Sequence, residues 1–102
     1  MADSLSIVSI PVTGCVVVRV GGEIDMATEP ELSKHLTGLN GSRVMLDLSD
    51  VGFIDSRGFR SLVEAHQRSE ANGGGLVISG VSPTAFKALQ ILGLDRVLHI
   101  TE

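Results

Sequence analysis

Apolar and polar residues alternate in several short segments, and this two-residue period is typical of β-strands with one buried face. The alternation marks residues 5–10 and 15–20, which are joined by "PVTG", a stretch with the proline and glycine of a turn. The pattern therefore predicts a β-hairpin. A third strand is predicted over residues 43–48, and the runs "LVIS" (76–79) and "RVLHI" (96–100) predict two more.

Between these strands the apolar residues recur every three or four positions, which is the period of an amphipathic helix. The first predicted helix covers residues 28–39 and begins with a capping box, in which Thr28 is followed three residues later by a glutamate. The second begins at Ser56 and ends at "NGGG". The third has Ser82 as its N-cap with a proline in the first turn, and it ends at Gly93.

The predicted order of elements is β-β-α-β-α-β-α-β, without repeats or a linker, which indicates a single α/β domain over residues 1–102. Helical crossovers favour parallel pairing, whereas the hairpin adds an antiparallel edge. The fold class is therefore a mixed, mostly parallel five-stranded sheet. Within residues 15–20 one strand face is all valine and the other includes Arg19, and residues 43–48 are similarly one-sided. This asymmetry predicts helices mainly on one face of the sheet, with the other face partly wet.

Composition and charge exclude some classes of partner. The sequence has no Trp or Tyr, and therefore little aromatic surface for stacking bases, and its net charge is −4. The basic residues are scattered and form no stripe for a phosphate backbone, so we expect no nucleic-acid partner. The N-terminus lacks a signal sequence and no apolar run approaches the ~20 residues that cross a bilayer, so we expect no membrane association. Cys15 has no internal disulfide partner and is interpreted as a buried small hydrophobe in a reduced, cytoplasmic protein.

Acidic residues and one serine follow the second and third strands, at the carboxyl ends where α/β sheets place their chemistry. Four residues are expected to gather at that rim: Asp25, Asp50, Asp55 and Ser56. Ser56 has two interpretations. Its hydroxyl could cap the helix by accepting an amide of the first turn. Alternatively it could be a phosphoryl acceptor, because a helix N-terminus favours an added anion.

The stretch "VMLDLSDVGFIDSRGF", with "GGEID" upstream, resembles the signature of STAS domains and, more narrowly, of bacterial anti-sigma factor antagonists. The order of elements agrees too, so the resemblance covers nearly the whole chain. It implies a regulator that binds an anti-sigma factor, itself a serine kinase, and thereby releases the sigma factor. The kinase phosphorylates the serine at the start of the helix and so ends binding. By position that serine is Ser56.

The resemblance also implies a contact surface around this serine. Asp25 and Asp55 match acidic positions that the family associates with partner contact and phosphorylation. Arg57 stands where a second serine or threonine is usual, and its guanidinium could pair with a phosphate or with an acidic residue of the partner. Arg60 occupies a first-turn position where the family often has a small residue. Many members also continue into a further helix after the last strand. The predicted partner-binding residues are Asp25, Asp55, Ser56, Arg57, Gly58, Phe59 and Arg60.

Phosphorylation would oppose binding because a phosphate adds about −1.5 to −2 charges to a surface that already holds carboxylates. A phosphatase would restore the binding form. ATP would belong to the kinase, since this chain has no Gly-rich phosphate loop, and no cofactor is expected. Three dispersed histidines and one cysteine form no metal-ligand spacing, so no metal site is expected.

Two other interpretations stay open from the sequence. A Ser-His-Asp hydrolase would pair Ser56 with His35, His66 or His99. Ten residues of helix put His66 about 15 Å away, while His35 is expected to be solvated and His99 to be packed in the last strand. The other interpretation is a STAS module without a switch, acting as a scaffold in stress signalling or as a subunit of a transport complex. Among these, the resemblance favours a regulator over an enzyme.

Overall fold

The computed structural model describes residues 5–101, and residues 1–4 and 102 lie outside the described residues. Residues 1–4 are part of the N-terminal stretch that is predicted to lack a signal sequence. Within the described range the elements follow the predicted order. They are β1 (Ser6–Val12), β2 (Cys15–Ile24), α1 (Glu29–Thr37), β3 (Arg43–Ile54), α2 (Ser56–Ala71), β4 (Gly75–Val81), α3 (Pro83–Ile91), a short 3₁₀ helix (Leu94–Arg96) and β5 (His99–Thr101).

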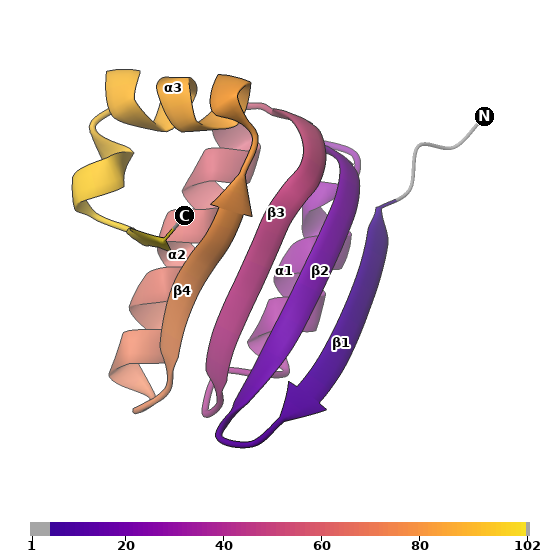
Figure 1. Cartoon of the computed structure of the whole chain (residues 1–102), viewed down its shortest axis with the longest axis vertical. Coiled ribbons are helices and arrows are strands. Elements are labelled where there is room, and N and C mark those ends of the chain that lie inside the picture. The colour runs from indigo at the N-terminus through magenta and orange to yellow at the C-terminus, as the bar shows by residue number, and fades with distance from the viewer. Residues whose placement is uncertain (1–4, 102) are drawn as a thin grey trace.

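The strands form one sheet in the order β1-β2-β3-β4-β5. β1 pairs with β2 antiparallel, and the pairs from β2 to β5 are parallel. Figure 1 shows α1 and α2 together behind the sheet, and α3 at the end of the sheet where β4 finishes. The predicted mixed, mostly parallel five-stranded sheet with helices mainly on one face is therefore confirmed.

The core lies between the sheet and the helices behind it. Val18, Leu46 and Ile78 are neighbours across β2, β3 and β4, and each is at most 1% exposed. Leu32 of α1 and Leu62 of α2 are fully buried. Burying an aliphatic side chain of this size contributes about 1.5–3 kcal/mol, so this layer supplies most of the driving force for folding.

β2 and β3 run further than the alternation predicts, to Ile24 and Ile54. Two shifts in the register between these strands, typical of β-bulges, break the two-residue period while the pairing continues. The last strand is shorter than predicted, at His99–Thr101. Gly93 has a positive φ of 74°, and the residues after it form a 3₁₀ turn before the strand begins.

The start of α1 differs from the predicted capping box. Thr28 occupies the N-cap position, but its side chain makes no cap hydrogen bond. It is buried, and its hydroxyl donates to the carbonyl of Glu23 at 2.7 Å. The amides of Ala27 and Thr28 donate instead to Asp25 Oδ1, at 3.0 and 3.1 Å. The predicted cap of α3 is confirmed, because Ser82 Oγ accepts an amide of the first turn at 3.2 Å.

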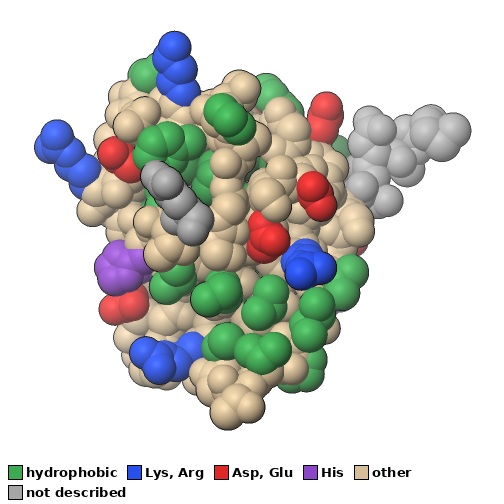
Figure 2. All heavy atoms as spheres, viewed as in Figure 1, with side chains coloured by type: hydrophobic (Ala, Val, Ile, Leu, Met, Phe, Trp, Pro, Cys, Tyr) green, Lys and Arg blue, Asp and Glu red, His purple; other side chains and the backbone are tan. Residues whose placement is uncertain are grey.

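The face of the sheet opposite α1 and α2 is open and partly apolar. Figure 2 shows hydrophobic side chains gathered over its lower half. Val8 and Met45 on this face are 51% and 40% exposed, and Arg19 lies 4.0 Å from Asp47 in a partly exposed ion pair. Hydrogen bonds from the hydroxyl and the amide of Ser49 hold the pKa of Asp47 below its ordinary value. The prediction of one partly wet face is confirmed.

Candidate functional site

The carboxyl ends of β2 and β3 meet the amino ends of α1 and α2 at one rim. Ile24 and Ile54 end the two strands and are partners in register, so Asp25 and Asp55 follow side by side. The amide of Asp55 donates to the carbonyl of Ile24 at 3.0 Å. The amide of Met26 donates to Asp55 Oδ2 at 3.1 Å. These two hydrogen bonds join the segment after β2 to the residue that precedes α2.

Asp55, and not Ser56, caps α2. Its backbone is extended, and its Oδ1 accepts the amide of Gly58 at 2.9 Å. Ser56 is the first residue of the helix and is exposed. The interpretation of Ser56 as the N-cap is therefore wrong, because the neighbouring carboxylate already accepts the amide. The Ser56 hydroxyl is not required for the cap and is presented to solvent at the rim.

Ser56 borders a polar groove of about 610 Å³ lined by residues of α1 and α2. The lining residues are Glu29, Ser56, Arg57, Arg60, Ser61 and Glu64. Buried Ser61 donates its hydroxyl to Glu29 Oε2 at 3.0 Å, and this bond links the two helices. Arg60 Nε lies 3.4 Å from Glu64 Oε2. The groove therefore places two guanidinium groups and two carboxylates around one exposed hydroxyl.

Gly58 and Phe59, predicted in the partner-binding surface, face the interior. A Cβ on Gly58 would lie 2.7 Å from the Cγ2 atoms of Ile24 and Ile54, and Phe59 is only 5% exposed. Glycine here lets α2 approach the strand ends closely. Both residues therefore offer little surface to a partner in this structure, and their place in the partner-binding surface stays a prediction.

Asp50 lies away from the rim, contrary to the prediction. It pairs with Gly21 within the sheet, and β3 continues for four residues beyond it to Ile54. At about 3.3 Å per residue, this places Asp50 roughly 13 Å back along the strand. The prediction is wrong because it assumed that the strand ended before Asp50.

The sequence interpretation missed several residues of the rim. Glu29 and Glu64 are not among the predicted site residues, although Glu64 lies four positions after Arg60, a spacing that predicts an ion pair on a helix. Met26 and Phe53 are 67% and 51% exposed and flank Asp25 and Asp55 in the chain. Exposed apolar side chains near charged residues are typical of protein-binding surfaces.

None of the three histidines, all within the described residues, is placed to act as a base for Ser56. His35 is half-buried, and its Nε2 lies 2.5 Å from the Ser9 hydroxyl on β1, which is its partner in place of Ser56. His66 lies ten residues along α2, about 15 Å from Ser56. The rings of His66 and His99 are 5.5 Å apart, and His99 is exposed rather than packed. The hydrolase interpretation therefore lacks its general base.

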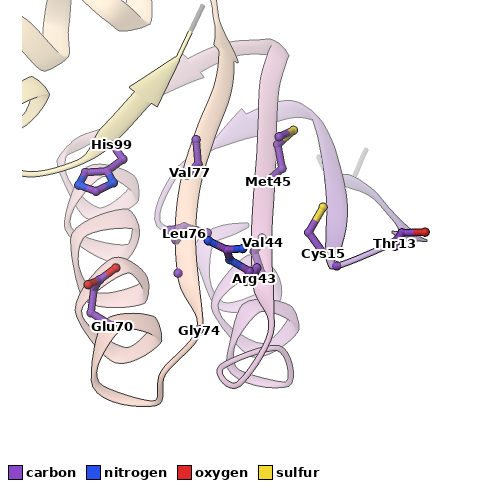
Figure 3. A pocket seen from close by; sticks show the side chains of 12 residues that line it. Thr13, Cys15, Arg43, Val44, Met45, Glu70, Gly74, Leu76, Val77 and His99 are labelled. Atoms are coloured by element: carbon purple, nitrogen blue, oxygen red, sulfur yellow. The ribbon is translucent and has the colours of Figure 1, made fainter.

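A second hollow, of about 470 Å³, lies at the other end of the sheet and is shown in Figure 3. Arg43 and Gly75, which line it, are the first residues of β3 and β4, so it is at the amino ends of these strands. Cys15 also lines it and is half-buried rather than buried, because it stands at the start of β2 beside the turn. This hollow is remote from the Ser56 rim.

Two further kinds of feature are absent from residues 5–101. No cluster of three or more histidine, cysteine, aspartate or glutamate side chains in that range could hold a metal ion. No helix in the same range has both the length and the apolar character needed to cross a bilayer.

Comparisons with known proteins agree with the resemblance inferred from the sequence. Residues 7–102 match the family described as the STAS domain. An anti-sigma-B factor antagonist of Staphylococcus aureus is 35% identical over 88 residues, which are 83% of this chain and 82% of that protein. The structure of an anti-sigma factor antagonist from Mycobacterium paratuberculosis matches with a TM-score of 0.85 and 27% identity, over 98% of this chain and 87% of that chain.

SpoIIAA shares the fold in two states. Its unphosphorylated form matches with a TM-score of 0.76 and 24% identity, over 95% of this chain and 89% of that chain. Its phosphorylated form from Bacillus matches with a TM-score of 0.71 and 20% identity, over 96% of this chain and 91% of that chain. The relatives named here are regulators, which confirms the prediction of a non-enzymatic protein. The chain belongs to the STAS domain family, and within it to the anti-sigma factor antagonists.

Proposed function

We propose that this protein acts by partner switching in the cytoplasm, with the Ser56 rim as its docking surface. In the unphosphorylated form the rim binds an anti-sigma factor that is also a serine kinase, and the sigma factor is released. Phosphorylation of Ser56 ends the binding, and a phosphatase restores it. The sigma factor would belong to a stress-response or sporulation pathway. The observation that carries this proposal is the exposed Ser56 hydroxyl at the first position of α2, beside a cap made by Asp55.

The position of Ser56 suits phosphoryl transfer. Its Oγ would bond to the γ-phosphorus of ATP held by the kinase, while the bond from that phosphorus to the β–γ bridging oxygen breaks and ADP leaves. The hydroxyl proton would pass to a base of the kinase. The amides and the positive dipole end at the start of α2 favour the new anion, and Asp55 fixes the helix start by capping it. This chain therefore supplies the acceptor, and the kinase supplies ATP and the base.

We assign the contact surface to the exposed part of the rim. Arg57 and Arg60 offer guanidinium groups to acidic residues of the partner, and exposed Met26 and Phe53 offer apolar area. Asp25 and Asp55 contribute mainly by shaping the loops, since both accept backbone amides. A phosphate on Ser56 would bring a poorly solvated dianion into this contact, and each 1.4 kcal/mol of lost binding free energy weakens affinity about tenfold.

The test is to incubate the purified protein with ATP and a candidate anti-sigma factor kinase from the same genome, and to measure its mass. The parent should gain one phosphate and Ser56→Ala should gain none. Ser61→Ala is the matched control, because Ser61 lines the same groove but is buried and bonded to Glu29. Equal phosphate uptake by the parent and by Ser56→Ala would show that the acceptor is another residue.

Binding to the same kinase, measured by calorimetry, tests the switch itself. Ser56→Glu should bind at least about tenfold more weakly than the parent, because it places a negative charge at the centre of the contact. Ser56→Ala removes the hydroxyl without adding charge and should keep most of the affinity. If both variants bind as tightly as the parent, the protein is a STAS module without a switch.

A further inference from the structure

One side of α2 carries a ladder of four polar residues, each four positions after the last: Ser56, Arg60, Glu64 and Arg68. Residues at this spacing are neighbours on a helix surface. Arg60 and Glu64 already form a pair with 3.4 Å between Nε and Oε2. Within residues 5–101, the Nε and Nη2 atoms of Arg68 are buried and have no hydrogen-bond partner. The two middle residues of the ladder, Arg60 and Glu64, are therefore paired, whereas these two Arg68 nitrogens have no partner among the described residues.

The existing pair is a weak one. The side chains of Arg60 and Glu64 are 80% and 52% exposed, so water and salt screen their attraction. The basic residue also precedes the acidic one, which is the less favourable order relative to the helix dipole. The two pairs that could replace it have the opposite order, with the acidic group first: a phosphate on Ser56 with Arg60, and Glu64 with Arg68.

We propose that phosphorylation of Ser56 shifts this ladder by one step: Arg60 leaves Glu64 to bind the phosphate, and the released Glu64 pairs with Arg68. Ser56, Arg60 and Glu64 line the same groove, and Arg68 follows Glu64 by four positions on α2, so each new pair joins neighbours on the helix surface. A phosphate offers about −1.5 to −2 charges and three acceptor oxygens, against the single charge of Glu64. The inference rests on the proposed function only in taking Ser56 as the residue that carries phosphate.

The exchange would give the switch a second component besides charge repulsion. In the unphosphorylated protein Arg60 belongs to the exposed docking surface and is held by one weak pair. In the phosphorylated protein it would be held against its own helix, so the partner would lose a guanidinium contact as well as meet an anion. Glu29 lines the groove from α1 and accepts the hydroxyl of Ser61, and its negative charge would oppose the binding of a phosphate there.

The experiment uses protein with phosphoserine inserted at position 56 during translation, so that no kinase is needed. The second pKa of the phosphate is measured by phosphorus NMR titration. In the Arg60→Gln variant this pKa should lie about 0.2–0.4 units above that of the parent phosphoprotein, the range expected for the loss of one helical i,i+4 pair. Arg57→Gln is the matched control, because it removes the same charge from the same groove at a position that does not face Ser56. It should raise the pKa by clearly less.

The second step is followed by nitrogen NMR of the Arg68 side chain. Phosphorylation should slow the exchange of its Nε proton with water, and Glu64→Gln should abolish this slowing. Equal pKa changes in Arg57→Gln and Arg60→Gln would overturn the specific pairing of Arg60, and an Arg68 signal unchanged by phosphorylation would overturn the second step. Because the phosphoserine is inserted directly, these outcomes are independent of whether any kinase modifies Ser56.

Discussion

At the scale of single residues, the start of α2 shows how two adjacent polar side chains take different roles. A carboxylate has two acceptor oxygens, and Asp55 uses one for the amide of Gly58 and the other for the amide of Met26. A serine hydroxyl at this position could not hold the segment after β2 and the first turn of α2 together as firmly. The cap therefore falls to Asp55, and this leaves the hydroxyl of Ser56 exposed at the rim.

Gly58 provides the residue-scale prediction. We expect Gly58→Ala to lower the free energy of unfolding by about 1–3 kcal/mol, because its Cβ would lie 2.7 Å from the Cγ2 atoms of Ile24 and Ile54. Urea unfolding followed by circular dichroism measures this. Gly52→Ala is the control, since a Cβ there meets nothing within 4 Å, and it should be close to neutral. Equal stability of both variants would mean that α2 can shift away from the strands at little cost.

At the scale of elements, α2 joins the core to the site. Its inner side packs Phe59 and Leu62 into the core, and its outer side carries the arginines and glutamate of the groove. One hydrogen bond, from Ser61 to Glu29, ties it to α1 across the groove. Any change at the beginning of α2 should therefore affect both the stability and the position of the Ser56 hydroxyl.

The element-scale prediction concerns the cap. Asp55→Ala should reduce the free energy of unfolding by about 1 kcal/mol for the lost cap, and by somewhat more because the amide of Met26 also loses its acceptor. Thermal unfolding of the parent and variant measures the loss. Asp55→Asn keeps an acceptor oxygen for the cap and should recover much of the stability. A full loss in Asp55→Asn would indicate that the charge, and not the hydrogen bonds, is what stabilises the rim.

At the scale of the whole molecule, the protein is a sheet with a core on one face only. Successive residues of β3 point to opposite faces, so Leu46 is fully buried and Met45 is 40% exposed. α1 and α2 cover one face of the sheet (Figure 1), and the other face is open (Figure 2). The exposed fractions assign Leu46 to the covered face and Met45 to the open one. The stability therefore comes from one layer of contacts, and the other face is available to solvent.

This one-sidedness can be tested with the adjacent pair. Leu46→Ala should cost about 2–5 kcal/mol in the free energy of unfolding, as expected for a large buried side chain. Met45→Ala, one residue away, should cost less than about 1 kcal/mol. Both losses are measured by urea unfolding at the same protein concentration. Comparable losses would show that the open face is covered in solution.

Much of the fold could be predicted because the core depends on local patterns. Alternating valines and leucines predicted the strands, and apolar residues recurring every three or four positions predicted α2. The same reasoning failed where tertiary contacts override the pattern. Bulges extended β2 and β3 beyond the alternation, and this displaced Asp50 from the rim. Thr28 matched a capping box in sequence but is buried, with its hydroxyl bonded to Glu23.

The sequence by itself determined the order of elements, the one-sided sheet and the segment that begins at Ser56, because hydrophobic periodicity and turn residues act over short stretches of chain. Only the tertiary structure decided which carboxylate caps α2, that Gly58 is a packing residue, and that Glu29 faces the same groove as Ser56. These facts depend on contacts between segments distant in the chain, whose approach is set by the packing of helices on the sheet and by no local pattern.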